Sequence, residues 1–252
     1  MLVALPAASA LASADVRLVN ASGAPDPLTL QVAVGGQTLP AGGATAFGET
    51  SDAVTVAPGD AKLSLSGDGG SDEQASIEKP LADGASYTLV ALPNGKDGLD
   101  LKVLRNGTAA PGDAKLRIVH AAPELGKPDI RLGDRTLAQG LEFRSDSGYV
   151  KVDPCAYKLS VARPNGGKAV LSMKLALAAG TASTVVVAGS GGSEARLIEV
   201  ADDTVTPPGA PHTGLGGIAR EQRPWLIALL AALLAGAAGG TLQLTRTRRS
   251  RG

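Results

Sequence analysis

The sequence contains the stretch VRLVNAS at residues 16–22, and a close copy of it, LRIVHAA, returns at residues 116–122. A second motif, KLSL at residues 62–65, returns in the same order as KLSV at residues 158–161. Ordered similarity at a nearly constant spacing is the signature of repeated structural units. The sequence therefore predicts that the chain is built from two duplicated modules.

Within each copy, apolar and polar residues alternate over short runs, and clusters of Gly, Pro, Asn and Asp separate these runs. Alternation with a period of two is typical of strands that are buried on one face. Short strands with turn residues between them indicate a β-sandwich. We therefore expect an all-β chain in which residues 15–108 and 109–203 each form an antiparallel, Ig-like β-sandwich. The Val- and Leu-rich runs that follow Gly84 and Gly180 are expected at the centre of a sheet.

The C-terminal region has the features of a membrane anchor. Residues 224–245 carry no charge, and a helix of this length spans the apolar core of a bilayer, which is about 30 Å thick. Four arginines follow within residues 246–252, which is the positive-inside pattern of a cytoplasmic tail. We therefore expect a transmembrane helix at residues 225–245, a Pro/Gly-rich stalk at 204–224, and both modules outside the cell membrane.

The first 14 residues predict a signal peptide. They carry no charge and end in ASA, the small-x-small pattern that signal peptidase accepts. Cleavage is expected before Asp15, although the basic region that normally opens such a peptide is missing. The alternative is that these residues form an apolar first strand of the first module.

The stalk contains the run APHTG at residues 210–214, followed by the apolar segment and the arginine tail. This order is similar to the sorting signal of Gram-positive wall proteins, which a sortase cleaves between Thr and Gly. The matching positions are Ala210, Pro211, His212, Thr213 and Gly214, with Ala210 in place of the usual Leu. Retention in the membrane is our main expectation, and attachment to a cell-wall polymer by a sortase is the alternative.

The composition argues against several kinds of site. The chain has six aromatic residues, whereas large rings normally dominate ligand clefts. Lys and Arg together number 24 and are balanced by 24 Asp and Glu, so no charge excess indicates nucleic acid. With one Cys and two His, an internal disulfide is excluded and a zinc site is disfavoured. We expect no cofactor, no metal and no nucleic-acid partner.

Four residues of the second copy are candidates for a functional role. His120 ends a predicted strand, and we interpret it mainly as a structural residue, because no GxSxG motif accompanies it. Asp129 and Arg131, together with His120, form the candidate ligand face. Cys155 is the only cysteine, and it is either buried behind a turn or pairs with a cysteine of another chain.

A family resemblance is carried by five segments of the second copy, which are LRIVHAAP (116–123), PDI (128–130), GYVKV (148–152), YKLSV (157–161) and AGTASTVVV (179–187). These segments resemble a bacterial family called domain of unknown function 4397, whose members are secreted or surface modules with a β-sandwich fold. The first copy matches more loosely, since Asn20 stands in place of His120. Cys155 departs from the Pro-Ala-Gly turn that is usual at its position. Because the family has no established activity, the resemblance implies an architecture rather than a reaction.

These observations favour a membrane-anchored surface protein with a structural or adhesive role and no catalytic activity. Its expected partners are the membrane, a cell-wall polymer or another surface protein. One alternative is a module that binds an envelope glycan or a small ligand. A hydrolase that depends on His120 is a further alternative.

Overall fold

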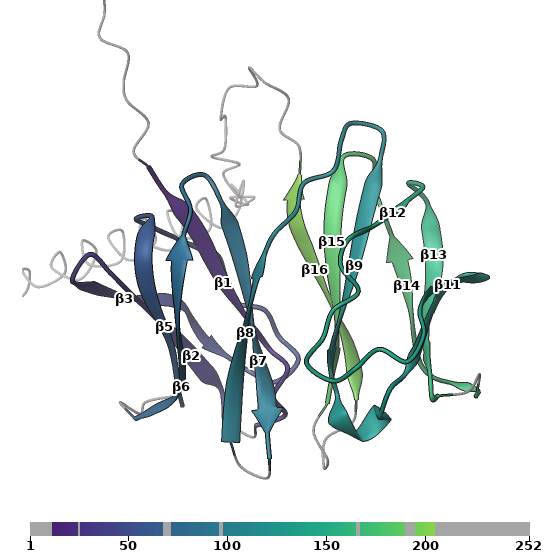
Figure 1. Ribbon diagram of the computed structural model, residues 1–252, viewed down its shortest axis with the longest axis horizontal. Coiled ribbons are helices and arrows are strands. Elements are labelled where there is room, and N and C mark those ends of the chain that lie inside the picture. The colour runs from purple at the N-terminus through teal and green to yellow at the C-terminus, as the bar shows by residue number, and fades with distance from the viewer. Residues whose placement is uncertain are drawn as a thin grey trace, which may run out of the picture. The chain divides into compact units, whose positions relative to one another are not determined.

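The computed structural model describes residues 12–24, 26–67, 72–95, 98–164, 167–189 and 195–204, all of which belong to one compact unit ending at Thr206. These residues form two tandem modules of eight strands each, with one short 3-10 helix, η1 (Pro123–Leu125), in the second (Figure 1). The prediction of an all-β chain with two tandem sandwiches is confirmed.

The strands of the first module are β1 (Ala14–Asn20), β2 (Leu28–Val34), β3 (Gln37–Thr45), β4 (Val54–Val56), β5 (Gly59–Gly67), β6 (Glu73–Leu81), β7 (Ser86–Asn94) and β8 (Gly98–Arg105). Those of the second are β9 (Ala114–Ala121), β10 (Asp129–Leu132), β11 (Arg135–Ala138), β12 (Val150–Val152), β13 (Ala156–Ala162), β14 (Ala169–Ala176), β15 (Thr181–Ala188) and β16 (Arg196–Thr204).

Each module consists of two four-stranded sheets with equivalent strand orders. The first has β4-β1-β7-β8 facing β3-β2-β5-β6, and the second has β12-β9-β15-β16 facing β11-β10-β13-β14. In both modules the Val- and Leu-rich strand, β7 or β15, is an inner strand of its sheet, as predicted.

The prediction that each sandwich is antiparallel is wrong at one strand pair per module. Strand β1 pairs in parallel with β7, and β9 pairs in parallel with β15, while the other pairs are antiparallel. Apolar alternation shows which face of a strand is buried, but it carries no information about the direction of the neighbouring strand. The sequence pattern could therefore not reveal these parallel pairs.

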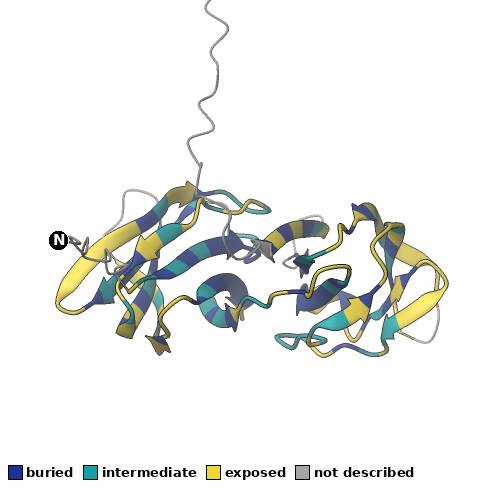
Figure 2. Cartoon of the chain, turned by 90° about the horizontal axis from the view of Figure 1, so that it is seen from above, coloured by how far each residue is buried: buried dark blue, intermediate teal, exposed yellow. Residues whose placement is uncertain are grey.

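The burial of the strands reflects three apolar cores. In β2 buried residues alternate with half-buried ones, because one face packs inside the first sandwich and the other faces outward. In β7 and β15 the buried residues are continuous, and Figure 2 shows such stretches beside alternating ones. Continuous burial arises because one face of each strand packs inside its own module and the opposite face packs in a third core between the modules.

The predicted anchoring segments lie outside the described residues. Among the residues that the structure describes, no helix is long and apolar enough to cross a membrane. The stalk, the helix at 225–245 and the tail therefore stay predictions. At the N-terminus, Ala14 is the first residue of β1 and pairs with Val56, so cleavage before Asp15 would remove one residue of this strand.

Candidate functional site

The two modules share a core that contains apolar residues from the facing sheets of both. Its buried members are Val19, Ala21, Val90, Leu92 and Leu104 from the first module and Val119, Ala121, Val186, Ala188, Ile198 and Val200 from the second. Burial of such side chains is favourable by roughly 1.5–3 kcal/mol for each large residue. The modules are therefore packed against each other through an extensive apolar contact and not merely joined by a linker.

Beside this apolar core lies a group of polar residues that we name the Asp202 cluster. Its members are Arg17, Thr88, Asn106, Arg117, Tyr149, Thr184 and Asp202. The Asp202 side chain has no exposed surface, and its Oδ1 accepts a hydrogen bond from Arg17 Nη2 at 2.9 Å. Its Oδ2 accepts hydrogen bonds from the hydroxyls of Tyr149 and Thr184, both at 2.6 Å. Asp202 thereby links β16 of the second module to β1 of the first.

The Asp202 cluster repeats the same arrangement once from each module. Arg17 Nε donates to Thr88 Oγ1 at 3.0 Å, and Arg117 Nε donates to Thr184 Oγ1 at 3.1 Å. The arginines occupy equivalent positions in the repeated motif at 16–22 and 116–122, and each threonine lies on the strand parallel to its arginine. Duplication therefore places two guanidinium groups near one carboxylate.

Asn106 occupies the position in the first module that Asp202 occupies in the second. Thr88 pairs with Leu104 and Thr184 with Val200, and Asn106 and Asp202 each follow two residues later. The Asn106 amide nitrogen donates hydrogen bonds to Thr88 Oγ1 at 2.9 Å and to Asp202 Oδ1 at 3.2 Å. The Asn106 amide oxygen accepts a hydrogen bond from Arg17 Nη2 at 3.2 Å. The neutral amide allows Asn106 to approach the Asp202 carboxylate, which a second carboxylate could do only against charge repulsion.

Tyr149 closes the cluster on the side of the linker between the modules. Its ring lies under the Arg117 guanidinium at 4.4 Å, and its hydroxyl accepts a hydrogen bond from Gly107 N–H at 2.9 Å. Burial, and then the hydrogen bond to Asp202, raise the pKa of Tyr149 to about 12. A Cβ atom at Gly107 would lie 2.7 Å from the Tyr149 ring, so the linker approaches the ring as closely as it does only because residue 107 is glycine.

Ion pairs and ring contacts border the apolar contact between the modules. Arg144 of the second module pairs with Asp100 of β8 at 3.1 Å, and Lys102 of β8 pairs with Asp146 at 3.1 Å. On the other border, the Arg196 guanidinium lies 4.6 Å from the centre of the Phe47 ring. These pairs are partly exposed, so each contributes little to stability and mainly fixes the orientation of the contact.

Arg144 adopts a left-handed backbone conformation with φ of 65°. The equivalent residue after the aromatic ring in the first copy is Gly48, with φ of 85°, which adopts this conformation without a steric penalty. A non-glycine residue held there costs about 1–3 kcal/mol. Arg144 also donates from Nη2 to Pro93 O at 3.4 Å, so its contacts with the first module offset this strain.

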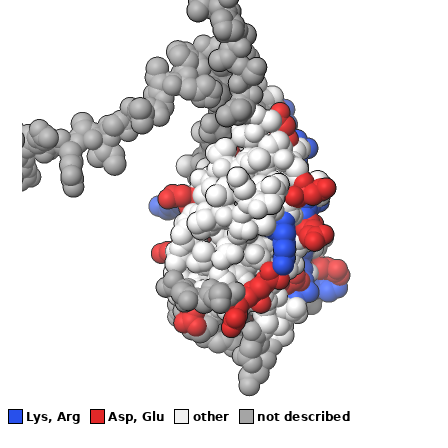
Figure 3. All heavy atoms as spheres, turned by 90° about the vertical axis from the view of Figure 1, so that its left-hand side faces the viewer, with Lys and Arg blue, Asp and Glu red and all other residues white. Residues whose placement is uncertain are grey.

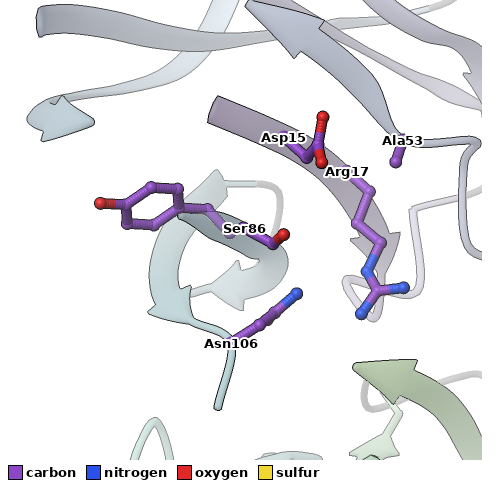
Figure 4. Close-up of a pocket in the computed structure, with 6 residues that line it drawn as sticks. Asp15, Arg17, Ala53, Ser86 and Asn106 are labelled. Atoms are coloured by element: carbon purple, nitrogen blue, oxygen red, sulfur yellow. The ribbon is translucent and has the colours of Figure 1, made fainter. Parts of the chain in front are cut away.

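A small pocket of about 70 Å³ adjoins the Asp202 cluster. It is lined by Asp15, Arg17, Ala53, Ser86, Tyr87 and Asn106. Figure 4 shows Asp15 and Arg17 projecting from β1, with the amide of Asn106 directed toward the Arg17 guanidinium. Ligand pockets for drug-sized molecules measure roughly 300–1,000 Å³, so this pocket suits water or a small ion.

The structure places His120 inside the second sandwich, away from the other two residues of the predicted ligand face. Its ring is fully buried; Nε2 lies 2.8 Å from Gly126 O, and Nδ1 accepts from Ala122 N–H at 3.3 Å. Burial lowers the pKa of His120, and the Gly126 carbonyl opposes this shift. Asp129 and Arg131 lie on the outward face of the opposite sheet, on β10. The three residues therefore do not form one surface.

The remaining predicted sites are placed as follows. Cys155 is exposed in the turn before β13, so the alternative in which it is buried is wrong, while its pairing with another chain stays a prediction. The sorting-signal residues 210–214 lie outside the described residues. In the part of the chain that the structure describes, no three His, Cys, Asp or Glu side chains converge to hold a metal ion.

The sequence analysis did not identify the Asp202 cluster. A usable signal was present, because an arginine interrupts an apolar strand at the same position of both copies, in residues 16–22 and 116–122. A charged residue that recurs in a buried strand requires a buried partner. No comparable pattern in the sequence indicated which carboxylate that partner was.

Comparisons with known proteins extend these observations. No curated protein matches the chain. Among solved structures, the chain is similar to the Bacillus anthracis TIE protein, with 9% identity and a TM-score of 0.23. The match covers 74% of this chain but only 34% of the TIE protein, so the chain spans about a third of the length of that protein. A Parabacteroides distasonis protein, provisionally described as a cell adhesion protein, is 9% identical with a TM-score of 0.25, covering 76% of this chain and 99% of that one. A streptococcal virulence factor described by its alpha-glucan binding is 11% identical, with a TM-score of 0.21, and the match covers 64% of this chain and 87% of that protein. At these TM-scores the likenesses carry no argument about function.

The family comparison is decisive for the classification of the chain. One family model matches residues 14–131 and matches again at residues 114–212, so that its two matches together cover most of the sequence. The first match extends beyond β8 into strands β9 and β10 of the second module. The chain therefore belongs to the family described as Domain of unknown function (DUF4397), and it carries that domain in tandem.

Proposed function

We propose that this protein is a non-enzymatic element of the cell surface, in which two sandwich modules act as one stiff body for structural support or adhesion. In this proposal the N-terminal segment directs export and the apolar segment at 225–245 anchors the chain in the membrane as a single span. The modules then lie outside the cell. Covalent attachment to a wall polymer at Thr213 and Gly214 is the alternative mode of anchoring.

One observation carries the proposal, which is the contact between the two modules. A tandem array that needed only flexible spacing would be joined by a linker, with each module exposing a polar outer sheet. Here the facing sheets bury a common apolar core and the Asp202 cluster. Separation of the modules would expose the apolar residues of this common core to water and is therefore strongly disfavoured.

Display outside the cell can be tested with the single cysteine of the chain. Cys155 is exposed, so a membrane-impermeant biotin maleimide should label it on intact cells that express the full chain. The Cys155→Ser variant is the matched control and should remain unlabelled. Labelling that occurs only after the cells are lysed would contradict display at the surface.

The mode of anchoring needs a separate measurement. If the chain is retained by its apolar segment, detergent should release it from cells, and a wall-digesting enzyme alone should leave it in the membrane fraction. Release by the wall-digesting enzyme without detergent would instead favour attachment at Thr213. The Thr213→Ala variant distinguishes the two results, because it should abolish only the second kind of release.

A further inference from the structure

The outward face of the β11-β10-β13-β14 sheet carries three positively charged side chains that we name the basic face. Lys158 on β13 lies directly opposite Lys174 on β14, and both are exposed. Arg131 on β10 lies opposite Ser160 of β13, which lies on the same face as Lys158 because it is two residues away. None of the ion pairs among the described residues involves Arg131, Lys158 or Lys174.

The first module shows what the same positions look like without the basic face. Its Lys62 is the counterpart of Lys158 in the repeat, but it lies opposite Glu78 and forms an ion pair with Glu73 at 2.7 Å. Gln31, which lies opposite Ser64, is the counterpart of Arg131. Figure 3 views the side of β3, β5 and β6 and shows a mostly uncharged surface, with more charged side chains along its right margin than along its left. The second module therefore has Arg131 where the first has the neutral Gln31, and Lys174 where the first has the acidic Glu78.

This exchange is unfavourable for the isolated fold. Like charges directly opposite each other on neighbouring strands destabilise a sheet, whereas the Lys62 and Glu78 pair of the first module is favourable. The fold itself does not require the lysine at 174, because the first copy forms the same sheet with a glutamate there. The repulsion between Lys158 and Lys174 is reduced when an anion lies between them.

We propose that the basic face binds a linear polymer with repeated phosphate groups. The Cβ atoms of opposed residues on neighbouring strands are about 4.5–5.5 Å apart, and diagonal neighbours are about 7–8 Å apart. The long Lys and Arg side chains that start from these positions can reach successive charges of one extended polymer. Ser160 lies opposite Arg131 and two residues from Lys158, and Ser172 lies opposite Ser160 and two residues from Lys174, so both hydroxyls adjoin the cations and can donate hydrogen bonds to phosphate oxygens.

Two further features of this face bear on the kind of ligand and on where the ligand binds. No aromatic residue occurs among the described residues of this face, so it offers no ring on which a nucleic-acid base or a sugar could stack. Asp129 lies on the same face, and its Oδ1 accepts a hydrogen bond from Gly140 N–H at 2.9 Å. Its negative charge lies on β10, two residues from Arg131, and leaves the pair of opposed lysines as the strongest point of attraction.

The inference goes beyond the proposed surface role, because binding in solution can be measured wherever the chain is located. The full chain in non-ionic detergent is titrated into fluorescent poly(glycerol phosphate), and anisotropy is recorded at low and high salt. Saturable binding that weakens with salt is expected, since cations bound to the polymer are released. The Lys174→Glu variant should weaken binding about 30-fold, because one attraction is lost and a repulsion of similar size is added. Arg131→Gln, which copies the first module, should weaken it about fivefold.

Lys79→Glu on β6 is the matched control, because it makes the same change of charge at an exposed position of the first module. It should change the affinity less than about twofold, since screening removes its effect at a distance. Equal losses for Lys79→Glu and Lys174→Glu, or no saturable binding, would overturn the proposal. Tighter binding to single-stranded DNA or to phosphatidylglycerol vesicles than to the polymer would also overturn it.

Discussion

Replacement of Asp202 by asparagine tests the role of the Asp202 cluster directly. The substitution preserves the shape of the side chain and one acceptor oxygen but removes the charge. Two guanidinium groups then remain close to a neutral amide, with the Arg17 side chain 18% and the Arg117 side chain 6% exposed. The hydroxyls of Tyr149 and Thr184 and the guanidinium of Arg17 currently donate to two separate oxygens, and asparagine offers only one.

The expected cost can be worked out from this geometry. Removal of one partner from a buried ion pair costs about 3–5 kcal/mol, and the partial exposure of Arg17 favours the lower end of that range. For a body of this size, about 3 kcal/mol corresponds to a fall in Tm of roughly 6–12 °C. Calorimetry and urea denaturation of the full chain in detergent both measure the change.

Asp146→Asn is the matched control for this experiment. Asp146 also pairs with a cation of the other module, Lys102, but both side chains are about a quarter exposed, at 26% and 24%. Loss of such a pair should cost only about 0.2–1 kcal/mol. If Asp202→Asn were no more destabilising than Asp146→Asn, the assignment of Asp202 as the central residue of the contact would be refuted.

Three further predictions concern protonation and backbone strain. NMR titration, with the His120 signals assigned from a His120→Gln variant, should give His120 a pKa below 6.5. The contribution of the neutral ring to stability is then present above pH 6.5 and is lost as the pH falls toward the folded pKa. A pKa of 6.5 for His120 would show that the ring is not buried. For Tyr149, with a pKa of about 12 against an ordinary 10, the contribution is complete below pH 10 and is lost between about pH 10 and 12. The urea midpoint of Tyr149→Phe should therefore fall less steeply over this range than that of the natural protein, and parallel curves would contradict the assignment. Arg144→Gly relieves backbone strain but removes the pair with Asp100, so its free energy of unfolding should change by no more than about 1–2 kcal/mol in denaturation. Arg144→Ala should be clearly destabilised, because it keeps the strain and loses the contact. Equal effects of the two substitutions would show that the strain is absent.

Much of the fold could be predicted from the sequence because it depends on local patterns. The repeated motif at 16–22 and 116–122 revealed the duplication, and alternation with a period of two revealed the strands. The parallel pairing of β1 with β7 could not be predicted, because the direction of a neighbouring strand depends on how the chain passes between the two sheets. The same limit applies to β9 and β15.

The contact between the modules was hidden for a different reason. Continuous apolar residues in β7 and β15 fit an inner strand of any sheet, and they do not show what covers its second face. The sequence analysis did not single out Arg17 and Arg117, although their recurrence at the same position of both copies was a signal of a buried role. His120 attracted attention as a scarce residue, yet its ring is fully buried and contacts backbone atoms of its own module.

The claim that the two modules form one stiff body is tested most directly by a distance measurement between them. One spin label is attached to Cys155 in the second module and another to a cysteine introduced by Lys79→Cys on β6 of the first, since both positions are exposed. Pulsed electron paramagnetic resonance on the full chain should give a single narrow distance distribution, and Asp202→Asn should broaden it. A broad distribution in the natural background, unchanged by Asp202→Asn, would contradict the claim and would describe two modules that move independently.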